Sequence, residues 1–139
     1  MEHLVFVFGT LKEGFPNFST NRGVRVPGLF TTVAAYPLYL VGERHSPWLL
    51  DDPGAGHRVV GELYRVDAET LAAMDRLERV SEPDGYRRKL LELEGEERQL
   101  LSAHAYLKQR QHLLPADIRL GPLPEYQGEH AALYRHRAT

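Results

Sequence analysis

Two parts of the chain carry residue types suited to chemistry, and the clearer one is a glutamate in a helical pattern. The pattern begins at Asp67, and Glu78 falls inside its apolar arc, at about 340° when Leu71 is set to zero. A carboxylate directed at an apolar interior is costly unless it is paired, hydrogen-bonded or protonated, and burial raises its pKa. Such a group can exchange protons near neutral pH, which favours an acid–base role for Glu78. The alternative is a helix-end glutamate that reaches solvent or pairs with Arg87 or Arg88.

The second candidate is a loop near the start of the chain. Residues 3–8 are apolar, β-branched and aromatic, which predicts a buried strand, and Gly-Thr-Leu-Lys-Glu-Gly follows at 9–14. A buried strand that ends in a glycine-bearing loop can present backbone N–H groups at the edge of the core. The loop lacks the Gly-Lys-Ser/Thr of a nucleotide-binding P-loop. A ligand-binding loop and a purely structural turn both remain open from spacing alone.

Other catalytic patterns are weaker. The seven histidines include no helical His-x-x-x-His pair with a nearby glutamate, so we expect no metal site. The chain has no cysteine, which excludes a disulfide framework and a thiol nucleophile. The serines lack the sequence context of a nucleophile elbow.

Composition bounds the class of protein. The 139 residues suffice for one domain, which we expect to span residues 1–139. Hydrophobic residues make up 42% and charged residues 26%, as in folded proteins, and the net charge of −2 argues against nucleic acid as a partner. No apolar run approaches the roughly 20 residues of a membrane helix. The start, Met-Glu-His-Leu, lacks the basic residues of a signal peptide, so we expect a cytoplasmic protein that binds no membrane.

The elements that must position these residues are mostly strands. Predicted strands cover residues 3–8, 24–29, 31–41, 57–66, 86–93 and 98–107, and one main helix runs from Asp67 to about Val80. Pro37 indicates an edge position or a bulge, and Gly61 indicates a bulge or a close backbone approach. The pattern predicts a mixed or antiparallel sheet, curled or barrel-like, with one main helix.

The opening motif resembles that of a known family. Phe8-Gly9-Thr10-Leu11-Lys12-x-Gly14 is similar to the Tyr-Gly-Thr-Leu-Lys-x-Gly signature of the gamma-glutamylcyclotransferase-like proteins. Further matches follow in order at Pro16-Asn17, Pro47-Trp48-Leu49-Leu50, Pro53-Gly54-x-Gly56 and Leu77-Glu78. Asn17 and the Pro-Trp-Leu-Leu run point to the gamma-glutamylamine cyclotransferase branch.

This resemblance implies an α+β fold, a small mixed β-barrel with flanking helices. It implies a pocket in which Phe8, Gly9, Thr10 and Leu11 bind substrate and Glu78 is catalytic. The implied reaction is intramolecular: the α-amine of a γ-glutamyl group attacks its own γ-carbonyl, which gives 5-oxoproline and a free amine without a cofactor.

For the amine-specific branch the implied substrate is a γ-glutamylamine such as γ-glutamyl-ε-lysine, and the implied assembly is a monomer or homodimer. Two alternatives stay open: a cyclotransferase for other γ-glutamyl compounds, and a non-catalytic binding module on the same fold. Phe8 departs from the family tyrosine, which matters only if that hydroxyl contacts the substrate.

Overall fold

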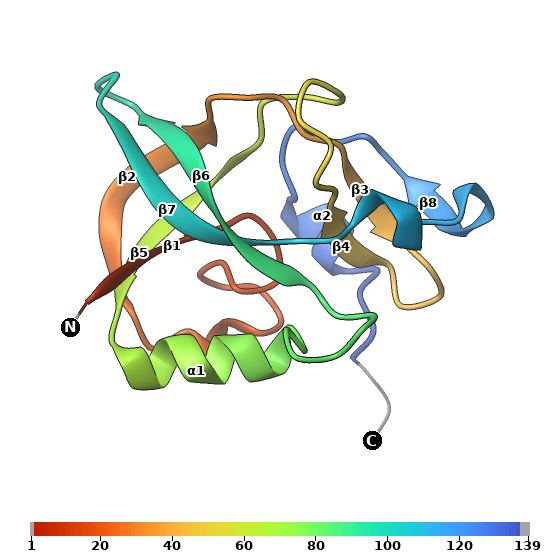
Figure 1. The fold of residues 1–139 in the computed structure, drawn as a ribbon, viewed down its shortest axis with the longest axis horizontal. Coiled ribbons are helices and arrows are strands. Elements are labelled where there is room, and N and C mark those ends of the chain that lie inside the picture. The colour runs from red at the N-terminus through yellow and green to blue at the C-terminus, as the bar shows by residue number, and fades with distance from the viewer. Residues whose placement is uncertain (1, 137–139) are drawn as a thin grey trace.

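Five strands close into a mixed barrel in the order β1-β5-β2-β6-β7 (Figure 1). The computed structural model describes residues 2–136. The barrel strands are β1 (His3–Val7), β2 (Val24–Thr32), β5 (Val60–Val66), β6 (Arg87–Gly95) and β7 (Leu100–Leu107). Neighbours are antiparallel except at the seam, where β1 runs parallel to β7 with Val5 opposite His104. The expected small mixed barrel is therefore confirmed.

A second, antiparallel sheet lies beside the barrel, away from the N-terminus (Figure 1). Its order is β4-β3-β8, formed by β3 (Leu38–Val41), β4 (Ser46–Leu49) and β8 (Ile118–Leu120). Helix α1 (Ala68–Leu77) runs along one side of the barrel, and α2 (Gly128–Ala131) is a single turn. Three short 3₁₀ helices span Phe18–Thr20, Arg110–His112 and Pro115–Asp117. The arrangement is α+β, as expected.

Strand β1 lies between two apolar cores because its side chains alternate. Phe6 and Phe8 join the larger cluster, which fills the barrel and continues toward the second sheet. Val5 and Val7 point the other way and pack with Met74 of α1. Burying both faces of β1 fixes where the strand ends, and so fixes the start of the loop that follows it.

The continuous strand predicted over 31–41 is wrong, because β2 ends at Thr32 and β3 begins only at Leu38. The Thr32 hydroxyl donates to the carbonyl of Ala34 (2.6 Å) and accepts from the N–H of Val59 (2.8 Å), which holds a bend. Pro37 then offers only its carbonyl, which accepts from Leu50 N–H at 2.9 Å. β-Branched composition predicted a strand here, and local hydrogen bonds of the threonine interrupted it.

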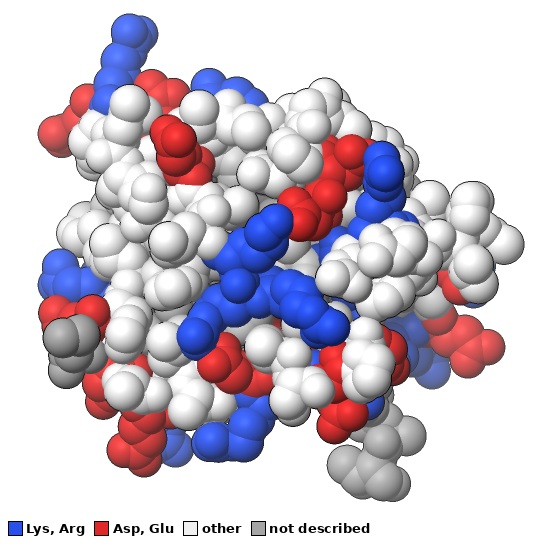
Figure 2. All heavy atoms as spheres, in the orientation of Figure 1, with Lys and Arg blue, Asp and Glu red and all other residues white. Residues whose placement is uncertain are grey.

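Charges of both signs lie close together on the face drawn in Figure 2. Figure 2 shows a group of Lys and Arg side chains near the centre of one face, bordered by Asp and Glu side chains. Ion pairs such as Arg58–Glu94 (2.6 Å) and Arg88–Asp75 (2.7 Å) join opposite charges across neighbouring elements. Within the described residues, no helix is long and apolar enough to cross a membrane.

Candidate active site

Glu78 lies at the C-terminal end of α1, where the helix stops. The helix ends at Leu77, so the prediction that it reaches Val80 is wrong, and Arg79 already has a positive φ of 55°. The Glu78 carbonyl accepts from the N–H of Tyr86 at 3.0 Å, which ties the helix end to the chain entering β6. The Glu78 residue is half-buried and lines a cavity of about 460 Å³. It therefore borders an open space, whereas the helical pattern had placed it in a filled apolar interior.

The predicted site residues all border this one cavity. Phe8, Gly9, Thr10 and Leu11 form one part of its lining and Glu78 another. Further lining comes from the β3–β4 turn, from the C-terminal end of β7 and from the segment after α2. Residues separated by about seventy positions in the sequence are brought together because β1 pairs with β5 in the barrel and α1 packs against the face that these two strands share.

The loop of residues 9–14, the glycine loop, turns its carbonyl groups toward the protein. The carbonyls of Gly9 and Thr10 accept from the N–H groups of Lys12 (3.1 Å) and Asn17 (2.8 Å), and Asn21 Nδ2 donates to the Leu11 carbonyl (3.1 Å). Within residues 2–136, the N–H groups of Gly9, Thr10 and Leu11 donate to no backbone carbonyl. Because these three residues also line the cavity, their N–H groups are candidate donors for an anion bound there.

Gly9 is required by a close approach to β4. A Cβ atom at this position would lie 2.9 Å from Cγ of Pro47, closer than carbon atoms pack in proteins. Pro47 is itself fixed, because its carbonyl accepts from the Tyr86 hydroxyl at 2.8 Å. Glycine at position 9 lets the loop lie directly against the second sheet, which closes this side of the cavity.

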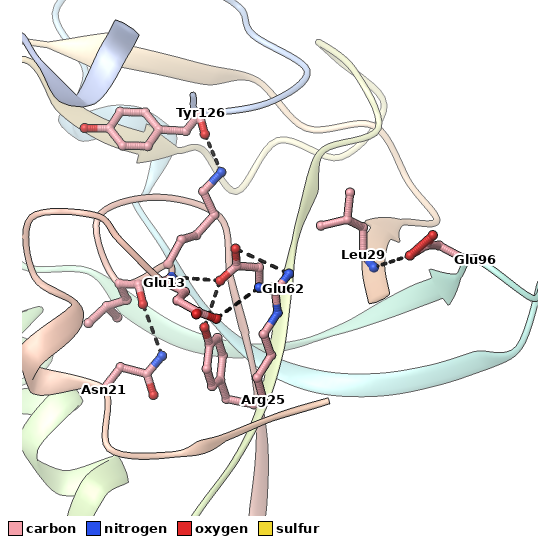
Figure 3. Close-up of polar contacts among 10 residues, drawn as sticks. Glu13, Asn21, Arg25, Leu29, Glu62, Glu96 and Tyr126 are labelled. Carbon is pink, nitrogen blue, oxygen red and sulfur yellow. Dashed lines mark hydrogen bonds and ion pairs between the residues drawn. The ribbon is translucent and has the colours of Figure 1, made fainter. Parts of the chain in front are cut away.

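A buried lysine, Lys12, holds the glycine loop in place. Lys12 is 4% exposed, and its Nζ donates to the carbonyl of Tyr126, which Figure 3 labels. The same Nζ lies 4.4 Å from the centre of the Phe15 ring. Burial lowers the pKa of Lys12, and the nearby carboxylates of Glu125 and Glu62 oppose this shift. The lysine of the opening motif thus points away from the cavity and fixes the loop.

Glu62 of β5 holds the next part of the loop (Figure 3). Its Oε1 accepts from the N–H of Glu13 (2.9 Å) and from the hydroxyl of Tyr64 (2.8 Å), and its Oε2 lies 3.5 Å from Arg25. Burial and the hydrogen bond to Glu62 raise the pKa of Tyr64, so this hydroxyl stays a donor. Glu62 is only 7% exposed, and each oxygen of its carboxylate has a hydrogen-bond or ion-pair partner that offsets the cost of burial.

The Phe8 ring is 7% exposed and belongs to the larger core cluster. Its neighbours there include Phe6, Leu49 and Tyr126. The side chain at position 8 thus packs as a core residue, and the residue also borders the cavity. A hydroxyl-free ring suits this environment.

Tyr106 and Asp75 form a hydrogen-bonded pair close to Glu78. The Tyr106 hydroxyl donates to Asp75 Oδ1 at 2.6 Å, and Arg88 Nη1 donates to Oδ2 of the same carboxylate at 2.7 Å. Burial, then the bond to Asp75, raises the pKa of Tyr106, and the charge of Glu78 adds to this. Arg88, one of the two arginines considered above as partners of Glu78, thus binds the Asp75 carboxylate.

We expect Asp75→Asn to lower the free energy of unfolding by about 1–2 kcal/mol, because the charge-assisted bonds to Tyr106 and Arg88 lose their anion. Urea unfolding followed by circular dichroism measures the change. The control is Asp84→Asn, since Asp84 is an exposed carboxylate 3.3 Å from Arg79. An equal loss in both variants would contradict a specific contribution of the Asp75 hydrogen bonds to stability.

Sequence patterns did not identify Lys108, which follows β7. Lys108 is 7% exposed, and its Nζ donates to the carbonyl of Asp84. The ammonium lies 4.3 Å from the centre of the Trp48 ring and 4.9 Å from that of Tyr86. All four residues line the cavity, which therefore has a cationic, aromatic wall. The only available signal was the sequence Tyr-Leu-Lys at a strand end, which is too common to predict a site.

Among residues 2–136, no group of three or more His, Asp or Glu side chains is arranged to hold a metal ion. The cavity lining instead offers backbone N–H groups, carboxylates of which those of Glu78 and Asp117 belong to half-buried residues, tyrosine hydroxyls and a buried ammonium. This donor set suits a small polar organic molecule with both anionic and cationic groups.

Comparisons with known proteins agree with this geometry. A family model described as "Gamma-glutamyl cyclotransferase, AIG2-like" matches residues 5–126. A gamma-glutamylaminecyclotransferase of Bos taurus is 37% identical over 142 residues, covering 96% of this chain and 82% of that protein. A gamma-glutamylaminecyclotransferase B of Danio rerio is 45% identical over 96 residues, covering 66% of this chain. That alignment covers 49% of the zebrafish protein, so the chain matches about half of that relative's length.

Solved structures show the same architecture. The crystal structure of an AIG2-like protein from Mus musculus superposes with a TM-score of 0.81 and 31% identity, covering 99% of this chain and 98% of that one. The superposition therefore covers nearly the whole of both chains.

Proposed function

The chain belongs to the gamma-glutamyl cyclotransferase, AIG2-like family, and from this membership we propose that it cyclises the γ-glutamyl group of a γ-glutamylamine to 5-oxoproline. The free amine is released, and γ-glutamyl-ε-lysine is the substrate to test first. The observation that carries the proposal is one cavity lined by both Glu78 and the backbone of residues 8–11. The proposed partner is therefore a small molecule, and the reaction as written requires no cofactor.

Glu78 is proposed to move the protons. The α-nitrogen forms a bond to the γ-carbonyl carbon, and the bond from that carbon to the leaving nitrogen breaks. The α-ammonium loses two protons on its way to the lactam N–H, and Glu78 passes them one at a time to the leaving nitrogen, which departs as an ammonium, so water supplies no atom. Because the nucleophile and the carbonyl belong to one molecule, the protein's main task is to hold them in the right geometry.

The glycine loop is proposed to bind the anionic part of the reacting group. The N–H groups of Gly9, Thr10 and Leu11 suit either the α-carboxylate of the glutamyl group or the oxyanion that forms at the γ-carbonyl. The Tyr106 hydroxyl gives its hydrogen to Asp75, so toward the cavity it offers lone pairs that can accept from the α-ammonium.

Incubation of the purified protein with γ-glutamyl-ε-lysine tests the proposal. We expect 5-oxoproline and lysine in equal amounts by mass spectrometry. In water enriched in ¹⁸O the 5-oxoproline should carry no label, whereas a hydrolase would give labelled glutamate. A panel of γ-glutamyl amino acids would reveal a broader substrate range. No product from any member of the panel would contradict the proposal and favour a binding module.

A further inference from the structure

The segment after α2 forms part of the cavity wall, and Arg44 holds it there. Arg44 Nε donates to the carbonyl of Arg135 (3.0 Å), and Nη2 donates to the hydroxyl oxygen of Tyr134 (2.9 Å). In return the N–H of Arg135 donates to the Arg44 carbonyl at 2.9 Å. The guanidinium carbon also lies 5.5 Å from the centre of the Tyr134 ring. Arg44 lies in the β3–β4 turn, and both Arg44 and Tyr134 line the cavity.

Hydrogen bonds connect Arg44 to the glycine loop along this wall. Asn17 Nδ2 donates to Thr10 Oγ1 at 2.9 Å and approaches the Tyr134 hydroxyl at 3.3 Å. The order along the wall is therefore Thr10, Asn17, Tyr134, Arg44. Two intervening side chains separate Arg44 from the backbone donors that are proposed to hold the glutamyl group. Arg44 thus borders the part of the cavity that the rest of the substrate would occupy.

The Arg44 guanidinium retains N–H groups that can bind a ligand at this position. Within the described part of the chain, its guanidinium is in ion-pair range of no carboxylate, and its Nη1 has no acceptor. The residue is half-buried, and its two other nitrogens are fixed by the bonds to residues 134 and 135. A guanidinium held in one orientation with N–H groups left over is suited to binding a carboxylate.

The same end of the cavity also carries negative charge. Glu43 and Asp117 are in its lining, and the Asp117 carbonyl accepts from the N–H of Gly42 at 2.8 Å, which keeps the two segments together. A cation and two carboxylates at one end of a cavity match a ligand that carries both an anionic and a cationic group. An alkyl amine without such groups would leave these charges unused.

We propose that Arg44 binds the carboxylate of the leaving group, so that the cavity selects γ-glutamylamines whose leaving amine is an amino acid side chain. The inference rests on the proposed function, since it assigns a binding residue to the leaving group of the same substrate. The arm between the scissile nitrogen and the carboxylate must then pass Tyr134, as the four-carbon arm of lysine would. Arg44 is thereby a specificity residue that contacts no reacting atom.

The experiment compares γ-glutamyl-ε-lysine with γ-glutamyl-cadaverine, which keeps the distal ammonium and lacks only the carboxylate. For the unaltered protein we expect kcat/KM to be roughly 10- to 100-fold higher for the lysine compound. Arg44→Met should bring this ratio close to one, and Arg44→Lys should leave an intermediate ratio. Arg119→Met is the matched control, because Arg119 donates to the Gly42 carbonyl at 3.4 Å and is outside the cavity lining. Its ratio should not change.

The ratio of kcat/KM for the two substrates separates a loss of carboxylate recognition from structural damage. If the segment after α2 is merely displaced in Arg44→Met, both substrates lose activity together and the ratio persists, which would overturn the inference. Equal kcat/KM for the two substrates in the unaltered protein would overturn it as well. In both cases 5-oxoproline is still formed, so the proposed function stands. Failure to form 5-oxoproline from any γ-glutamyl compound would instead overturn the proposed function.

Discussion

Glu78→Gln is expected to lower kcat for 5-oxoproline formation by about 10²–10⁴-fold, the range contributed by a positioned acid–base group. Glutamine matches glutamate in size and keeps the hydrogen bonds of the backbone at the helix end. It cannot take a proton from the α-ammonium or return one to the leaving nitrogen. The measurement is single-turnover product formation by mass spectrometry, which isolates the chemical step from product release.

The matched control is Glu69→Gln, on the same helix but exposed and outside the cavity. It should leave kcat unchanged. Glu78→Asp adds a second comparison, because it keeps the carboxylate but shortens the arm by one methylene; we expect an intermediate kcat. Circular dichroism must show that each variant is folded. Full activity in a folded Glu78→Gln protein would exclude the proposed role.

Gly61→Ala is expected to lower the free energy of unfolding by at least about 2–3 kcal/mol. A Cβ atom on Gly61 would lie 2.5 Å from the carbonyl oxygen of Val7 and 2.8 Å from the Phe6 ring. The nearest atom belongs to the backbone of β1, so no change of rotamer relieves the contact. Strands β1 and β5 must separate locally, which also moves the start of the glycine loop.

Urea unfolding monitored by circular dichroism measures this loss. Gly128→Ala is the control, because a Cβ atom there has no neighbour within 4 Å and alanine favours the helix that begins at this residue. The control should be neutral or slightly stabilising. If both alanine variants unfold at the same urea concentration, the close packing of β1 on β5 does not limit stability.

The barrel strands and the main helix could be predicted because their signals are local and uninterrupted. Strand β1 is a run of apolar residues, and Asp67 accepts from the Thr70 N–H at 2.8 Å, as its position before the helix predicts. Gly61 indicated the close approach to β1 that the structure contains. The segment 31–41 misled prediction, because the bend depends on hydrogen bonds of Thr32 to distant Val59 and nearby Ala34.

The candidate site was only partly predictable, for a physical reason. Glu78 stood out because it broke a helical pattern, and the glycine loop because it broke a strand. Lys108 and Arg44 break no pattern: each is a charged residue between the named strands and helices, where charged residues are common. Their position on the cavity depends on how β4, the residues after β7 and those after α2 come together, which no local pattern encodes.

The anchored carbonyls of the glycine loop have a thermodynamic consequence. The bonded carbonyls of Gly9 and Thr10 share their peptide planes with the N–H groups of Thr10 and Leu11, so these planes cannot rotate freely and the two N–H groups keep their direction. The conformational entropy of ordering these donors is lost when the chain folds, not when a ligand arrives. The loop is therefore preorganised, and an anion that binds there gains its hydrogen bonds without a further entropic penalty on the backbone.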